Sequence, residues 1–280
     1  MSRTHVSQGL KLHYLDWGNE AAPLLLLVHG MRDHAHSWDW VARELRHEWH
    51  VIAPDLRGHG DSQWSSDAAY LNPYHVFDIA DLIDSVGCEQ LVIVGHSFGG
   101  NVSARYAAIF PQRVRKLVLV DSLGPAAKVL ANWAEQPVER TRDWLQERRK
   151  AAARMPRRFA TFDEVVARMA AANRHLSPEQ AHHLALHGAR LDADGYGWKY
   201  DPVIGSFLPE DFSVDGARFW REISAATLLC WGTESWTTNP ETDGRAANFR
   251  NHRTLVFDGA GHWIHHEQLR AFLAALNEFL

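Results

Sequence analysis

Short runs of Leu, Val and Ile recur along the chain and predict buried strands. An apolar run of this length is typical of a strand that is covered on both faces, as in a parallel sheet. A shorter pair of segments, 5–7 and 11–16, flanks Gln8-Gly9 and predicts an antiparallel hairpin at one edge of the sheet. The apolar runs occupy residues 24–29, 51–54, 91–94, 117–120, 227–231 and 255–257.

Helical spacing fills the intervals between these runs. Gly87 follows one such segment and Pro111 ends another, and both residues are common stop signals for helices. Strands that alternate with helices in this way predict an α/β fold with a mostly parallel central sheet wound with helices. The helical segments cover residues 37–45, 74–85, 98–110 and 267–280.

The alternation stops after Asp121. Roughly a hundred residues follow without another buried-strand run, which is too long for an ordinary connection between a strand and a helix. Helical spacing, with Ser177 as an N-cap, predicts that this insertion is a helical cap, whereas residues 192–209 are less regular. We therefore expect residues 1–121 and 226–280 to form an α/β core and residues 122–225 to form the cap. The helices expected in the cap cover residues 132–154, 162–172 and 178–186.

Composition and charge narrow the classes of function. Of the 280 residues, 46% are hydrophobic and 22% are charged, as in a soluble globular protein. A net charge of −5 argues against a nucleic-acid partner, and the basic stretch 148–158 is interpreted as a solvated helix face. The chain has no apolar run long enough to span a bilayer and no signal-peptide core at residues 1–8, so we expect a cytoplasmic protein without a membrane partner.

Cysteine and histidine give no metal pattern. Cys88 and Cys230 match neither a disulfide framework nor a metal-binding motif, which suits a reducing compartment. We expect neither a metal nor a cofactor, because cysteine or carboxylate ligands do not accompany the histidine pairs at metal-site spacing. Those pairs are His34/His36, His182/His183 and His265/His266, among 18 histidines in total.

The most informative motif is G-x-S-x-G at residues 95–99, which follows the apolar run 91–94 and precedes helical spacing. A strand that turns sharply into a helix at this motif forms a nucleophile elbow, in which a strained serine protrudes and glycines allow close packing. The helix directs free N–H groups and the positive end of its dipole toward the serine oxygen. Negative charge develops there during acyl transfer, so Ser97 is predicted to be a nucleophile.

Four motifs in this order resemble the α/β-hydrolase fold superfamily, and the resemblance covers nearly the whole chain. It is closest to esterase- and lipase-like members that have a serine nucleophile and a helical cap. The motifs are His29-Gly30, residues 55–62 (Asp-Leu-Arg-Gly-His-Gly-Asp-Ser), residues 95–99, and Gly259-Ala260-Gly261-His262.

The resemblance implies roles for further residues. His262, on a loop after the last strand, is the expected general base, because an unperturbed pKa of about 6.5 lets it accept and return a proton at neutral pH. The family pattern also implies an oxyanion hole made by two backbone N–H groups. One belongs to Phe98, directly after the nucleophile, and the other to Met31, in the loop after His29-Gly30.

The triad acid departs from the commonest family pattern. That pattern places an aspartate three residues after the glycine of Trp231-Gly232, where this sequence has Ser235. Glu234 lies one position earlier, whereas Asp121 follows the preceding strand, where certain haloalkane dehalogenases of this fold carry their acid. We prefer Asp121, with which the order Ser, Asp, His is preserved, and keep Glu234 as the alternative.

The nucleophile also limits the substrate. Epoxide hydrolases and haloalkane dehalogenases of this fold attack with an aspartate at the elbow, so a serine favours cofactor-free hydrolysis of a small carboxylic ester. His34, Trp38, Trp236 and Trp263 are candidates to face the substrate pocket, although packing of the cap would also use tryptophans. Hydrolysis of a lactone, thioester or carbon–carbon bond stays open, as does a hydrolase-fold receptor with slow turnover.

Overall fold

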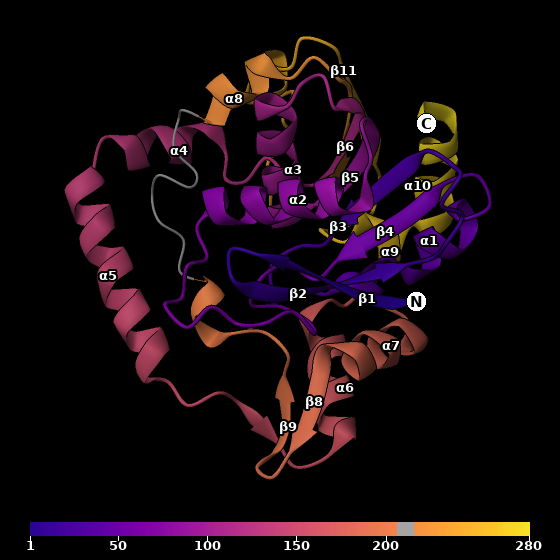
Figure 1. Ribbon diagram of the computed structural model, residues 1–280. Helices are drawn as coiled ribbons and strands as arrows, with labels where there is room; N and C mark the ends of the chain where they lie inside the picture. Colours follow the sequence, from indigo (N-terminus) through magenta and orange to yellow (C-terminus); the bar gives the residue numbers. More distant parts are fainter. Residues whose placement is uncertain (206–215) are drawn as a thin grey trace.

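The computed structural model describes residues 1–205 and 216–280 and contains a central sheet of eight strands (Figure 1). Pairing is antiparallel between the first three strands of the sheet and parallel between all the others. The order across the sheet is β1 (Ser2–Ser7), β2 (Leu10–Asp16), β4 (His50–Pro54), β3 (Leu24–Val28), β5 (Leu91–His96), β6 (Val114–Val120), β10 (Ala226–Gly232) and β11 (His252–Phe257).

Helices cover both faces of the sheet, because the central strands are apolar on both sides. In β3, Leu24 and Leu26 belong to one hydrophobic cluster, whereas Leu25 and Leu27 belong to the other. The first cluster packs against α2 (Asn72–Val86), α3 (Ser97–Ile109) and α8 (Gly216–Glu222). The second packs against α1 (Asp39–Leu45), α9 (Ile264–Glu267) and α10 (Leu269–Phe279).

The chain leaves the sheet after β6 and returns to it at β10. β7, β9 and β8 form a small antiparallel sheet, and Phe159 of β7 packs with Val165 and Ala185 in a separate hydrophobic cluster. In Figure 1, α5 runs along one side of the molecule, and α6, α7 and the small sheet lie below the N-terminal strands. The elements are α4 (Ala127–Ala134), α5 (Pro137–Ala153), β7 (Arg158–Phe159), α6 (Phe162–Ala172), α7 (Pro178–Gly188), β8 (Ala189–Asp192), β9 (Gly195–Trp198) and η2 (Pro202–Gly205).

The predicted fold class is confirmed. Each apolar run forms a strand of the central sheet, the N-terminal hairpin is the β1–β2 pair, and the expected helices occupy the intervals. The terminal helix differs in detail, because the chain departs from helical dihedrals at Gln268 (φ −131°) and divides it into α9 and α10.

The insertion differs from the prediction in two places. The helix expected over residues 132–154 is two helices, because Pro137 has no N–H to continue α4 and instead starts α5. Part of the stretch expected to be irregular is the β8–β9 hairpin, whose turn uses Gly195 at a φ of 100°. Residues 206–209 of that stretch lie outside the described residues. Ser177 forms the predicted N-cap, as part of a capping box at the start of α7.

Within residues 1–205 and 216–280, every helix is too short or too polar to cross a bilayer. Cys88 and Cys230 are free thiols, and Cys230 is buried in β10, where burial raises the pKa of its thiol.

Candidate active site

A tight turn between β5 and α3 carries Ser97. Its φ of 52° lies in the left-handed region, which residues other than glycine rarely adopt. A Cβ on Gly95 would collide with the backbone of Gly100, and a Cβ on Gly99 would collide with the carbonyl oxygen of His29. Glycine at these two positions therefore lets β3, β5 and α3 approach closely enough to hold Ser97 in this conformation.

Three side chains from separate loops form a hydrogen-bonded chain. Ser97 Oγ lies 2.9 Å from Nε2 of His262, and Nδ1 of His262 contacts Oδ2 of Asp121. With its proton on Nδ1, His262 donates to the carboxylate and accepts from the serine hydroxyl. A histidine held in this way can take a proton from the hydroxyl as the oxygen attacks an electrophile.

Backbone contacts fix the loops that carry His262 and Asp121. Nε2–H of His96 donates to the carbonyl of His262 at 3.0 Å. Burial, reinforced by the neighbouring His262 ring, holds the pKa of His96 well below its ordinary value, so the His96 ring is neutral. Asp121 follows β6 at a φ of 49°, and its N–H donates to the carbonyl of Cys230 at 2.9 Å.

The carboxylate of Asp121 is buried and fully engaged. Besides His262, it accepts a hydrogen bond from Ser235 Oγ on Oδ2 and one from Thr237 Oγ1 on Oδ1. The sequence shows only that Ser235 stands where the commonest family pattern has the acid. It does not indicate that the hydroxyls of Ser235 and Thr237 donate hydrogen bonds to the Asp121 carboxylate. A cluster of hydroxyl residues directly after β10 was the available signal.

Glu234, the alternative acid, does not join this chain. Its carboxylate pairs with Arg174 at 2.5 Å and with His175 at 3.3 Å, and its side chain is 42% exposed. The structure thus brings Asp121 to His262 and leaves Glu234 on the surface.

Met31 and Phe98 border the same space as Ser97. Phe98 lies in the first turn of α3, and Met31 lies in the loop that follows β3. A Cβ on Gly30 would stand 2.8 Å from Nδ1 of His96 and 3.1 Å from Cβ of Ser97, so glycine allows this loop to lie against the elbow. The N–H groups at a helix start favour an anion at this place.

The motif at residues 55–62 braces the loop that carries Met31. Asp55 accepts hydrogen bonds from the ring of His13 at 2.7 Å, from the N–H of Ala35 at 2.7 Å and from the N–H of Asp61 at 2.8 Å. Burial alone would raise the pKa of the Asp55 carboxyl, but these donors hold it well below its ordinary value. The charged carboxylate therefore joins β2, the loop after β3 and the loop after β4.

A cavity of about 570 Å³ opens beside Ser97. α4 and α5 form part of its wall, so the insertion and the sheet both contribute to it. Among the described residues, the groups that could together hold a metal ion contain none that lines this cavity. Its aromatic lining consists of Phe98, Trp133, Trp144, Trp236 and Trp263, and its charged lining of Arg32, Asp121, Arg140, Asp143 and Glu147.

Comparison with protein families shows to which family the chain belongs. A family model described as alpha/beta hydrolase fold matches residues 23–269. The chain belongs to the α/β-hydrolase fold family. The match begins just before β3 and ends at the start of α10, so it includes the elbow, the insertion and the loop of His262.

Known relatives of this hydrolase fall into several classes. Esterase Rv0045c of Mycobacterium tuberculosis is 29% identical over 271 residues, which are 92% of this chain and 83% of the esterase. Its crystal structure superposes with a TM-score of 0.75 at 26% identity and covers 100% of this chain and 90% of that one. The 3-hydroxybutyrate-oligomer hydrolase of Cupriavidus necator is 32% identical over 229 residues, 77% of this chain and 73% of the relative. Epoxide hydrolase 4 of Mus musculus is 34% identical over 119 residues, 42% of this chain, and the chain spans only 33% of that relative. These relatives support a hydrolase.

Two predicted pocket residues of the hydrolase lie elsewhere. His34 is buried, and its Nε2 contacts the carbonyl of Leu184 in α7 at 3.0 Å. Trp38 is fully buried and stacks on His265 with ring centroids 4.4 Å apart. The reason is that η1 (Ala35–Trp38) is largely buried and lies against α1 and α7, which a loop sequence does not reveal.

Sequence reasoning missed the charged part of the cavity wall. Arg140, Asp143 and Glu147 border the cavity, although α5 buries none of its residues. The guanidinium of Arg140 lies over the ring of Trp133, 4.0 Å from its centroid. Because α5 leaves Val138 and Leu145 exposed and turns Trp144 to the cavity, its apolar residues do not mark a single face, and their spacing does not indicate which face borders the cavity.

Proposed function

We propose that this chain is a serine hydrolase that cleaves a small carboxylic ester through an acyl-enzyme on Ser97. His262 acts as general base and general acid, and Asp121 orients the imidazole. The observation that carries the proposal is the hydrogen-bonded chain from Ser97 Oγ through both nitrogens of His262 to Asp121 Oδ2. The backbone N–H groups of Met31 and Phe98 serve as the oxyanion hole.

In the first half-reaction, Ser97 Oγ attacks the carbonyl carbon of the ester while its proton passes to Nε2 of His262. The imidazolium that forms is stabilised by the Asp121 carboxylate. Negative charge on the former carbonyl oxygen is accepted by the two backbone N–H groups and by the positive end of the α3 dipole. The bond to the alcohol oxygen then breaks, and that oxygen takes the proton from Nε2.

In the second half-reaction, water attacks the acyl carbon and gives its proton to Nε2 of His262. The bond between the acyl carbon and Ser97 Oγ breaks, and Oγ recovers the proton. The products are a carboxylic acid and the free enzyme, and no cofactor enters either step.

The cavity supports an ester with an apolar acyl or alcohol group. Trp133 and Trp144 come from the insertion, and Trp236 and Trp263 come from loops of the sheet domain, so aromatic surface surrounds the approach to Ser97. The volume of about 570 Å³ suits a small molecule. The names of the mycobacterial esterase and of the 3-hydroxybutyrate-oligomer hydrolase also support ester chemistry for this chain.

We further propose that residues 1–121 and 226–280 act as the catalytic core and that residues 122–225 act as a lid. The contribution of α4 and α5 to the cavity wall supports this division. So does the separate hydrophobic cluster that joins β7, α6 and α7.

Covalent labelling tests the proposed function. The protein is treated with a fluorophosphonate and analysed by intact mass spectrometry and peptide mapping, and turnover is measured with p-nitrophenyl acetate, butyrate and octanoate. We expect a single adduct on Ser97, rapid ester turnover, and loss of both in Ser97→Ala. Labelling at another residue, or acylation of Ser97 without turnover, would contradict the proposed hydrolase.

A further inference from the structure

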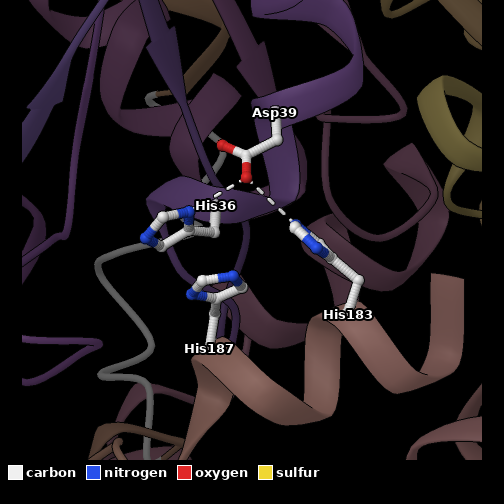
Figure 2. Close-up of side chains that lie close together, drawn as sticks. All are labelled: His36, Asp39, His183 and His187. Atoms are coloured by element: carbon white, nitrogen blue, oxygen red, sulfur yellow. Dashed lines mark hydrogen bonds and ion pairs between the residues drawn. The ribbon is translucent and has the colours of Figure 1, made fainter. Parts of the chain in front are cut away.

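Four side chains with metal-binding atoms converge where α7 meets the start of α1 (Figure 2). His36 belongs to η1, Asp39 is the first residue of α1, and His183 and His187 belong to α7. One ligand atom from each residue lies within 4.8 Å of the others. Asp39 Oδ2 is 3.0 Å from Nδ1 of His36 and 3.0 Å from Nε2 of His183.

Local structure places each pair of ligands on one face. His183 and His187 are separated by one turn of α7, and His36 and Asp39 by one turn across the junction of η1 and α1. The ring of His34 contacts a backbone carbonyl of α7 at 3.0 Å, which holds the helix against this junction. The ligands are therefore brought together by the packing of two rigid elements.

Hydrogen bonding alone does not account for the cluster. Both ion pairs of Asp39 are with histidines, so its charge is neutralised only where these rings carry a proton. In the described part of the chain, the ring of His187 makes no side-chain hydrogen bond and contacts other rings, with centroids 3.6 Å from His36 and 4.6 Å from His183. Three imidazoles thus surround one carboxylate, and a cation between them would engage all four groups.

Two other groups of described side chains have ligand atoms equally close together, but each of their carboxylates already has a partner outside the group. The Ser37 hydroxyl donates to Asp33 and contacts His266, each at 2.8 Å, in the group Asp33, His265 and His266. The other group consists of His13, Asp55 and Asp61. In it, Asp55 accepts hydrogen bonds from backbone N–H groups, and Asp61 pairs with Lys199 at 2.8 Å.

We propose that His36, Asp39, His183 and His187 together bind one divalent transition-metal ion, for which Zn²⁺ is the best fit. Three imidazole nitrogens and one carboxylate oxygen suit Zn²⁺, whereas Ca²⁺ and Mg²⁺ prefer oxygen ligands alone. Four protein ligands complete a tetrahedron and leave no open position, so the ion has a structural role.

The side chains must move inward to bind the ion. Zn–N and Zn–O bonds of about 2.0–2.2 Å place tetrahedral ligand atoms roughly 3.3–3.6 Å apart, compared with separations of up to 4.8 Å here. Rotation about side-chain torsions can supply this change, because both backbone elements already face each other. His36 and His183 are 25% and 19% exposed, which leaves the ion a path from solvent.

The bound ion would join the insertion to the sheet domain. α7 lies between β6 and β10, whereas η1 and α1 follow β3, and Met31 precedes η1 in the same loop. The ion would therefore fix α7 and this loop to each other without touching Ser97. The sequence does not indicate this cluster, because its two pairs of side chains lie far apart in the chain.

Metal binding is tested without substrate and on protein from which any affinity tag has been removed. The protein is stripped with EDTA, dialysed and titrated with ZnCl₂ by isothermal calorimetry, and bound zinc is counted by mass spectrometry of the metal. We expect one Zn²⁺ per chain and a higher unfolding temperature with Zn²⁺. Loss of a residue that only hydrogen-bonds to a metal ligand typically lowers metal affinity 10–100-fold. His187 is proposed to bind the ion directly, so His187→Ala is expected to weaken Zn²⁺ binding by at least ~100-fold.

His182→Ala is the matched control, because His182 is exposed on α7 and packs on Phe162, with ring centroids 5.3 Å apart, outside the cluster. It should bind Zn²⁺ as the wild type does. Unchanged affinity in His187→Ala, or an equal loss in His182→Ala, would overturn the site. Unfolding in EDTA checks that the variants fold, and if His187→Ala does not, the near-isosteric Asp39→Asn decides, since it must also weaken binding.

Discussion

The hydroxyl of Ser235 donates a hydrogen bond to Oδ2 of Asp121, the same oxygen that contacts Nδ1 of His262. Ser235 stands where the commonest family pattern has the acid, three residues after Gly232. The two residues meet because β6 and β10 are adjacent parallel strands that end at the same edge of the sheet. A carboxylate at either strand end is therefore expected to lie close to His262.

Asp121→Asn should lower kcat/KM for p-nitrophenyl butyrate by roughly 10⁴-fold, the size of the corresponding effect in a serine protease triad. An amide keeps the shape of the carboxylate but cannot stabilise the imidazolium or hold Nδ1–H as a donor. Glu234→Gln is the control and should retain near wild-type turnover, because Glu234 pairs on the surface with Arg174. The reverse pattern of activities would assign the acid to Glu234.

Moving the carboxylate from one strand end to the other should restore part of this loss. We expect Asp121→Ser combined with Ser235→Asp to be at least ~10-fold more active than Asp121→Ser alone, which corresponds to an activation barrier lower by about 1.4 kcal/mol. Ser235→Asp alone should lower activity, because two adjacent carboxylates cannot both stay charged without cost. Equal rates for the double variant and Asp121→Ser would show that the end of β10 does not reach His262.

The sheet was predictable from local sequence because its central strands are buried on both faces. β3, for example, is a run of Leu and Val with no polar position, and such a run has few alternatives to a buried strand. The small sheet of the insertion was not predictable. β7 has two residues, and β8 and β9 are mostly exposed or half-buried, so neither length nor apolar alternation indicates strands.

The candidate site shows the same contrast between local and long-range information. The position of Ser97 follows from a five-residue motif, and that of His262 from a glycine-rich loop after a strand. The places of His34 and Trp38 depend on the burial of η1 and on α7, which packs there from far along the chain. Loop composition carries no information on such packing, so these two side chains were assigned to the wrong environment.

Ser97→Gly should be more stable than Ser97→Ala. Both variants lack the nucleophile and should be inactive, but glycine adopts the observed φ of 52° without the steric cost that alanine retains. A difference of about 1 kcal/mol corresponds to roughly 2–4 °C in unfolding temperature for a chain of this size class. Differential scanning calorimetry of the two variants measures it, and a lower unfolding temperature for Ser97→Gly would show that the elbow is not strained.

We expect the aromatic cavity to favour longer acyl chains, and Trp144→Ala should weaken that preference. Trp144 lines the cavity from α5, and loss of apolar contact of this kind changes discrimination by roughly 10-fold or more. The expected result is a ~10-fold fall in the octanoate-to-acetate ratio of kcat/KM, with little change for acetate. Trp64→Ala is the control, because Trp64 lies against Arg190, 4.9 Å from its guanidinium, and does not line the cavity. An unchanged ratio in Trp144→Ala would place the acyl group elsewhere.

Stability should fall as the pH drops from 7 to 5, because buried histidines stay neutral in the folded state. Burial, aided by the nearby His59, lowers the pKa of His29 from 6.5 to about 3, and burial lowers that of His59 from 6.5 to about 4. Above pH 6.5 these rings are neutral in both states and their full contribution is present. As the pH falls below 6.5, the unfolded chain binds protons that the folded chain cannot, so folding becomes less favourable.

Two such histidines should lower the free energy of unfolding by roughly 4 kcal/mol between pH 7 and pH 5. Urea denaturation at several pH values in this window measures the slope. Asp55 contributes mainly at lower pH, since its depressed pKa removes stability only as the pH falls below the ordinary carboxyl value of 3.8. The window therefore separates the contribution of the histidines from that of Asp55. His59→Gln should reduce the slope and the exposed His47→Gln should not, whereas a slope unchanged by His59→Gln would mean that His59 titrates equally in both states.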